Sequence, residues 1–127
     1  MSLRFTVPGE PHAWERARQQ GRRRFNSSEM TAAKKTIAQY ADLAIREARE
    51  SSSYPKVGNF VMSCQFFLGS TRSSDPDLDN LLKLVMDALN GVAWRDDRQV
   101  IVAAATKIRV ISGARTEIHL KHHRERE

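Results

Sequence analysis

The segment from Leu78 to Leu89 constrains the fold of this chain more than any other. Its apolar side chains recur at the i, i+3, i+4, i+7 spacing of an amphipathic helix. They are Leu78, Leu81, Leu82, Val85, Met86 and Leu89. The pair Asn90-Gly91 follows, which is typical of a helix C-terminus. The segment therefore predicts a helix that covers an apolar surface.

A second helix is predicted between about Ser28 and Ser51, where mostly alanine and isoleucine side chains form the contact stripe. Its small residues allow another backbone to approach closely, either the sheet or a second subunit.

Four segments have strand patterns. Residues 3–7 alternate apolar and polar side chains, and residues 59–68 indicate a largely buried strand. Residues 99–109 are apolar on both faces in their first half and indicate an interior strand, and residues 115–120 indicate a half-exposed strand.

These elements predict one α+β domain over residues 1–127, with helices packed on a mixed sheet of about four strands. The order is β-α-β-α-β-β. Residues 9–27 are predicted to form a basic loop, and residues 121–127 a frayed, charged tail.

Composition narrows the functional classes. The single cysteine, Cys64, excludes an internal disulfide framework and is predicted to be a small core residue. No apolar run is long enough to cross a membrane, and the N-terminus lacks the apolar core of a signal peptide, so we expect a cytoplasmic protein. No histidine has a ligand-spaced partner, which argues against zinc, and no glycine-rich phosphate loop indicates an organic cofactor.

The chain is strongly basic, with 21 Lys+Arg against 15 Asp+Glu and a net charge of +6. This balance favours a polyanionic partner such as nucleic acid. The arginines of the basic loop are candidate DNA contacts, although a basic run is more often a solvated surface. They are Arg16, Arg18, Arg22, Arg23 and Arg24.

Two acidic clusters stand out against this positive charge. Asp75, Asp77 and Asp79 precede or begin the helix at residues 78–89, and Asp96 and Asp97 follow it. A divalent cation that bridges carboxylates and phosphates would reconcile acidic groups with a polyanionic substrate. Mg²⁺ or Mn²⁺ prefers such oxygen ligands.

The two clusters are separated by a helix about 20 Å long. Asp97 can meet Asp79 only if residues 91–99 fold back along the helix, with Trp94 as an anchor, or if a second subunit supplies it. Lys83, one turn after Asp79, could neutralise phosphate charge. Taken singly, these residues are more often helix caps, turn residues and surface pairs.

The strings DLDNLLK (residues 77–83), DALNG (87–91) and WRDDRQV (94–100) resemble the core of the RusA family of Holliday junction resolvases. The similarity is dense over about residues 75–101 and includes the FTVPG string at residues 5–9. The resemblance implies a Mg²⁺-dependent homodimeric endonuclease that resolves four-way DNA junctions by paired nicks in recombination and repair. It implies essential aspartates at Asp77, Asp79 and Asp97 and a functional lysine at Lys83.

One departure is the N-terminal loop, where the family commonly has a proline between basic residues and this chain has the stretch Trp14 to Arg18. Two alternatives stay open at this point: a non-catalytic DNA-binding protein, and a metal-dependent nuclease for flaps or single strands. Whether Asp75 and Asp96 assist the site is also open.

Overall fold

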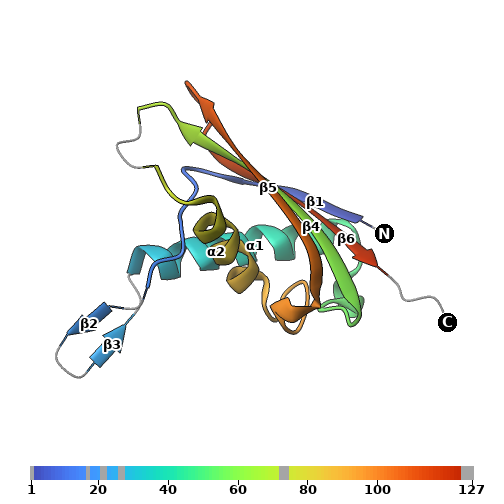
Figure 1. The fold of residues 1–127 in the computed structure, drawn as a ribbon. Helices are drawn as coiled ribbons and strands as arrows, with labels where there is room; N and C mark the ends of the chain where they lie inside the picture. Colours follow the sequence, from blue (N-terminus) through green and yellow to red (C-terminus); the bar gives the residue numbers. More distant parts are fainter. Residues whose placement is uncertain (1, 17, 21–22, 26–27, 72–74, 124–127) are drawn as a thin grey trace.

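A computed structural model describes residues 2–16, 18–20, 23–25, 28–71 and 75–123. Two α-helices cover one face of a four-stranded mixed sheet whose strand order is β1-β6-β4-β5 (Figure 1). The helices and strands of these two layers are β1 (Ser2–Pro8), α1 (Ser28–Glu47), β4 (Asn59–Gly69), α2 (Leu78–Leu89), β5 (Val100–Val110) and β6 (Arg115–His123). The predicted α+β class and element order are confirmed.

The core lies between the helices and one face of the sheet. Alternate side chains of β4 are buried on that face, from Phe60 to Leu68, while the intervening side chains reach the opposite face. The stripe of α2 that includes Leu81, Val85 and Leu89 is fully covered, as its spacing predicts. Cys64 is buried in β4, which confirms its predicted role as a core residue. The sheet therefore has one covered face and one open face.

The connection between β4 and β5 determines where the acidic clusters lie. These strands are parallel, with Phe60 opposite Val100 and Gly69 opposite Val110, and α2 forms the crossover between them. The chain leaves β4 at one end of the sheet and enters β5 at the other. The acidic segment before α2 and the one after it are thus placed toward opposite ends of β5.

The predicted position of one strand is wrong. β5 was expected to be interior but is an edge strand, with Ile101 and Val102 each 52% exposed. β6 is half exposed as predicted, with Thr116, Ile118 and Leu120 buried on one face, and it lies inside the sheet because it pairs with both β1 and β4. The apolar pattern of a strand indicates whether its environment is buried, but the connections of the chain determine which strands it pairs with.

Two boundaries also differ from expectation. The basic loop contains a two-stranded ribbon, β2 (Arg18–Gln20) paired antiparallel with β3 (Arg23–Phe25), which is too short and polar to show an apolar alternation. The predicted tail begins too early, since β6 continues to His123. His122 is fixed there by a 2.6 Å contact from Nε2 to the Val57 carbonyl oxygen. Residues 124–127 lie outside the described residues.

Within the described part of the chain, no helix is both long and apolar enough to cross a membrane.

Candidate metal and nucleic-acid site

Asp77 and Asp79 lie at the N-terminus of α2, as the sequence predicts. Asp77 occupies the N-cap position, and its carbonyl oxygen accepts a hydrogen bond from the Leu81 N–H at 3.1 Å, but its side chain makes no capping hydrogen bond. Asp79 is in the first turn, where one carboxylate oxygen accepts from the Asn80 N–H at 2.9 Å. Both side chains are exposed, at the helix end that favours negative charge. Their carboxylates are therefore accessible to a ligand.

Asp75 is held by two cations of β5. Its carboxylate lies 3.1 Å from Lys107 Nζ and 2.8 Å from Arg109 Nη2, and Lys107 also donates to the Pro76 carbonyl oxygen at 3.0 Å. Lys107 and Arg109 are two residues apart in a strand, so they share a face. These contacts tie the segment that enters α2 to the C-terminal half of β5. Neither cation is recognisable from the sequence, because only the fold places them beside Asp75.

Lys83 is covered by the ring of Trp14. The Lys83 ammonium nitrogen lies 3.6 Å from the ring centroid, and the backbone N–H of Trp14 donates to the Asn80 carbonyl oxygen at 2.8 Å. At an exposed residue such as Lys83, a cation–π contact of this kind contributes about 0.5–1 kcal/mol. The chain segment that leads to the basic ribbon is thus attached to the polar side of α2, one turn from Asp79. Sequence reasoning missed this role of Trp14.

The segment around Asp97 is pinned by the Gln99 side chain. Gln99 Oε1 accepts from the Arg95 and Asp96 N–H groups at 2.9 and 3.1 Å, while Nε2 donates to the carbonyl oxygens of Lys56 and Gly58, just before β4, at 2.9 and 2.8 Å. Asp96 is used as a cap, because its carboxylate accepts from the Arg98 N–H at 2.9 Å. This capping box opens the short 3-10 helix η2 (Asp97–Gln99). Asp96 therefore has a structural role, and Asp97 is the one carboxylate of this acidic pair that the capping does not use.

Trp94 anchors the same segment, as predicted, but at the far end of α2. Its side chain is fully buried, its ring makes an edge contact with Phe60 at 5.2 Å between centroids, and its Nε1–H donates to Asn90 Oδ1 at 2.9 Å. Residues 91–99 do not return along the helix toward Asp79. They are held where α2 ends and β5 begins.

Asp97 consequently lies near Asp87. Desolvation raises the pKa of Asp87, and the negative charge of Asp97 raises it further, while Lys34 and Lys83 act in the opposite direction. Asp87 is two turns beyond Asp79, about 12 Å along the helix axis at 1.5 Å per residue. The described residues of one chain include no group of three acidic, histidine or cysteine side chains arranged to hold a metal ion. The fold brings Asp77 together with Asp79, and Asp97 together with Asp87.

The Asp87→Asn variant is expected to melt at a higher temperature than the wild type at pH 7 without metal. The pKa of Asp87 is raised in the folded state, so the ionised form destabilises the fold and protonation relieves that cost. Stability from this group accordingly falls as pH rises from the ordinary carboxyl pKa through the raised value. At pH 3 the gain should vanish, because Asp87 is then protonated in both states. Thermal unfolding followed by circular dichroism at both pH values measures this, and an equal gain at pH 3 would contradict it.

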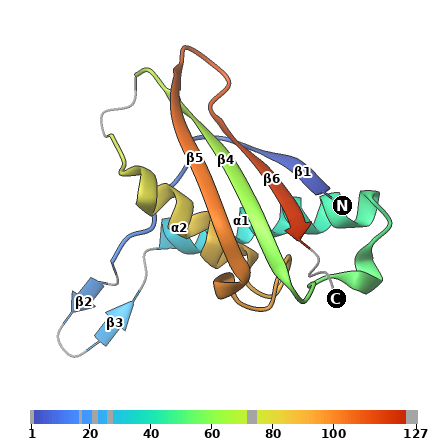
Figure 2. The same ribbon diagram turned by 45° about the vertical axis from the view of Figure 1, so that its right-hand side comes forward.

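The predicted DNA contacts lie on or beside the ribbon of β2 and β3. Figures 1 and 2 show this ribbon projecting from the domain on the same side as α2. Arg16 precedes it and is exposed, Arg18 lies on β2, and Arg23 and Arg24 lie on β3. Arg22 lies outside the described residues. The ribbon thus carries basic residues away from the domain, a few residues after the contact of Trp14 with α2.

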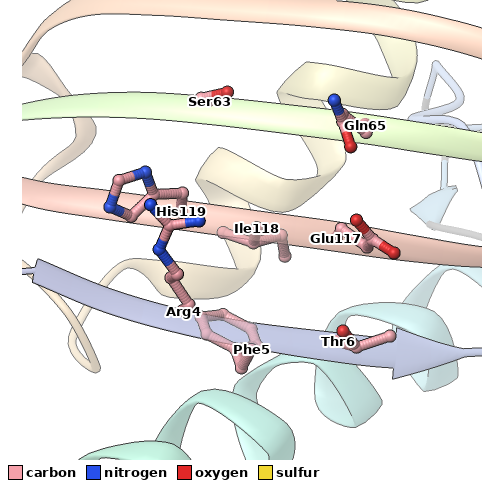
Figure 3. Close-up of a pocket in the computed structure, with 8 residues that line it drawn as sticks. All are labelled: Arg4, Phe5, Thr6, Ser63, Gln65, Glu117, Ile118 and His119. Carbon is pink, nitrogen blue, oxygen red and sulfur yellow. The ribbon is translucent and has the colours of Figure 1, made fainter.

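A pocket on the open face of the sheet does not belong to this site. It is lined mainly by β1, β4 and β6, with Arg4, Gln65, Glu117 and His119 among its side chains (Figure 3). Its one carboxylate, Glu117, already pairs with Arg115 at 2.7 Å. The acidic residues singled out in the sequence lie elsewhere, on the helix-covered side of the sheet and in the loops at its ends.

Comparison with known proteins agrees with the resemblance in the sequence. The family model described as endodeoxyribonuclease RusA matches residues 8–121, which include the basic ribbon, both acidic clusters and all four strands of the sheet in whole or in part. No curated protein is significantly similar to the chain. Nucleases of this family are typically metal-dependent and act on DNA junctions. The chain belongs to the RusA family of endodeoxyribonucleases, the Holliday junction resolvases.

Proposed function

We propose that this resolvase works as a homodimer and hydrolyses four-way junctions with Mg²⁺ held by Asp77, Asp79 and Asp97. The observation that carries the proposal is the state of Asp77. It stands at the N-cap of α2, where an aspartate usually accepts a backbone hydrogen bond, yet its side chain makes none. Helix capping therefore does not account for Asp77, and its carboxylate is left for a ligand.

The donor set fits a hard cation. Asp77 and Asp79 offer exposed carboxylate oxygens two residues apart, and Mg²⁺ typically takes one or two carboxylates together with water and substrate phosphate. Mn²⁺ would be accepted by the same oxygens. When bound, the metal supplies an activated water and charge stabilisation for the leaving 3′ oxygen of a phosphodiester.

The chain's own residues would position the DNA around that centre. Lys83 lies one turn from Asp79, where its ammonium group can offset phosphate charge as it builds, and the Trp14 ring restricts its position. The arginines of the ribbon and the +6 net charge would hold the phosphate backbone. Asp75 would act indirectly, by fixing the entry to α2 through Lys107 and Arg109.

Asp97 supports a role for a second subunit. Hydrogen bonds from Gln99 and the buried Trp94 hold its segment at the far end of α2, near Asp87, a residue about 12 Å from Asp79 along the helix axis. A second copy could deliver Asp97 to the Asp77–Asp79 end without any refolding. A two-fold dimer also matches the symmetry of paired nicks in a four-way junction.

The test is cleavage of a synthetic four-way junction, a 5′ flap and a linear duplex of matched sequence, each with Mg²⁺ and with EDTA. We expect paired symmetric nicks in the junction with Mg²⁺ and no product with EDTA. Cleavage that survives EDTA would refute the metal proposal. Equal cleavage of the flap and the junction would instead favour a general branched-DNA nuclease.

A further inference from the structure

Residues 9–16 lead from β1 toward the ribbon, and on the way they are attached to the elements that carry the acidic site (Figures 1 and 2). The Glu10 carboxylate accepts a hydrogen bond from the Gly69 N–H at 2.9 Å, where the chain leaves β4 for the acidic segment. The backbone N–H of Trp14 donates to the Asn80 carbonyl oxygen, in the first turn of α2, at 2.8 Å. Residues 9–16 therefore hold both ends of the stretch that contains Asp77.

The ring of Trp14 extends this attachment from the backbone of α2 to the side chain of Lys83. The ammonium nitrogen lies 3.6 Å from the ring centroid, although Lys83 itself is exposed. An exposed lysine on its flexible stem would otherwise sample many rotamers in water. Trp14 is half-buried and packs against the core, so its ring offers the ammonium group a fixed surface.

A ring holds an ammonium group in a way that a carboxylate cannot. Asp79 and Asp87 lie one turn to either side of Lys83 on α2, at the spacing of helical ion pairs. Among the residues that the structure describes, neither carboxylate forms an ion pair with Lys83. An ion pair would neutralise the ammonium charge, whereas the face of a ring leaves that charge and most of the N–H donors available to an anion. Lys83 is thus held one turn from Asp79 and can still meet a phosphate.

We propose that Trp14 is a positioning residue for the cleavage step, because its ring holds the Lys83 ammonium group in place for the scissile phosphate. This inference rests on the proposed role of Lys83 in junction cleavage and adds the side chain on which that role depends. Trp14 itself touches neither the metal nor the phosphate and acts through Lys83. A charged group that is ordered before the substrate arrives stabilises the transition state more than one that must be ordered during the reaction.

The first experiment compares Trp14→Leu, which removes the aromatic face but keeps an apolar side chain, with Trp14→Phe, which keeps a smaller aromatic face. Single-turnover cleavage of a four-way junction with Mg²⁺ and saturating protein should be about tenfold slower for Trp14→Leu and within about threefold of the wild type for Trp14→Phe. Junction binding by gel shift in EDTA should stay within about threefold for both, because neither substitution changes a charge. Circular dichroism checks that both variants are folded.

A double-mutant cycle with Lys83→Met separates positioning from a general effect on the fold. Lys83→Met keeps the length of the side chain, removes its charge, and should slow cleavage by about 100-fold. Adding Trp14→Leu to Lys83→Met should then cause no further loss, because no ammonium group is left to position. A comparable further loss in the double variant would show that Trp14 acts through the fold and would overturn the proposal.

The matched control is Phe67→Leu, which removes the ring that lies 3.8 Å from the Arg115 guanidinium carbon, on the open face of the sheet. This variant loses a cation–π contact of the same kind away from the acidic site, and its cleavage rate should equal that of the wild type. An equal loss in Phe67→Leu and Trp14→Leu would overturn a role specific to Trp14.

The remaining outcomes separate this inference from the function on which it rests. A Trp14→Leu variant that cleaves at the wild-type rate, beside a slow Lys83→Met variant, would overturn positioning by Trp14 and leave the role of Lys83 intact. A Lys83→Met variant as fast as the wild type would overturn both. A folded Trp14→Phe variant as slow as Trp14→Leu would show that the aromatic face does not hold Lys83, which also overturns the proposal.

A spectroscopic test decides the matter even if Trp14→Leu fails to fold. The ring current of an indole shifts the resonances of protons over its face upfield, so the Lys83 Cε protons should be displaced from those of the other lysines. Proton–carbon correlation spectra of the wild-type protein with isotope-labelled lysine measure this displacement, and the resonance is assigned by its loss in Lys83→Met. Absence of a displaced lysine resonance in the folded wild type overturns the proposal.

Discussion

Asp79→Asn is expected to lower the rate of junction cleavage by at least ~10³-fold while junction binding stays within a few-fold of the wild type. The substitution keeps the size of the side chain and the acceptor for the Asn80 N–H but removes the negative charge that would hold the metal. Binding should persist because the basic residues that contact phosphate are unchanged. Single-turnover cleavage and gel-shift titration at one fixed salt concentration measure the two quantities separately.

The matched control is Asp75→Asn, an equally small change in the same acidic segment. Asp75 is bonded to Lys107 and Arg109, so its loss should loosen the entry to α2 and lower the rate by less than about tenfold. If Asp79→Asn cleaves as fast as Asp75→Asn, the aspartates of α2 are not the metal ligands. If both variants are inactive, Asp75 belongs to the site as well.

Trp94→Ala is expected to give the largest loss of stability, about 3–5 kcal/mol in the free energy of unfolding. The side chain is fully buried, packs on Phe60, and bonds Asn90 where α2 ends, so truncation leaves a cavity and an unpaired amide. Urea denaturation followed by circular dichroism measures the change. Because the same side chain holds the segment of Asp97, cleavage should also fall.

Two further variants separate packing from the hydrogen bond. Trp94→Phe keeps most of the apolar contact and should cost clearly less than Trp94→Ala. Val57→Ala, at a side chain that is 66% exposed, should change the free energy of unfolding by less than about 0.5 kcal/mol. A Trp94→Ala variant as stable as Val57→Ala would show that the ring does not anchor this segment.

The elements that could be predicted are those specified by local pattern. The spacing from Leu78 to Leu89 predicted α2 to its last residue, and the dense apolar run after Asn59 predicted β4. The neighbours of β5 and β6 could not be predicted, because an apolar strand at the edge of a sheet and one inside it can have the same composition. The ribbon of β2 and β3 was missed because three-residue polar strands have no periodicity.

The candidate site could likewise be predicted only where its residues are neighbours in the sequence. The position of Asp77 and Asp79 at a helix start followed from neighbouring residues, and so did the place of Lys83 one turn later. The contacts of Asp75 with Lys107 and of Lys83 with Trp14 join residues far apart in sequence, so no spacing rule could show them. The sequence posed two routes for Asp97, a fold-back along α2 or a second subunit. The segment from Trp94 to Gln99 is held where α2 ends, so the fold-back does not occur among the described residues.

The contact between Trp14 and Lys83 gives this protein a built-in optical reporter. The chain has two tryptophans, and the buried one, Trp94, is remote from the start of α2. In a Trp94→Phe background the emission would come from Trp14 alone, whose ring lies 3.6 Å from the Lys83 ammonium group and whose backbone is bonded to Asn80. Intrinsic fluorescence would then follow events beside Asp79 without any attached dye.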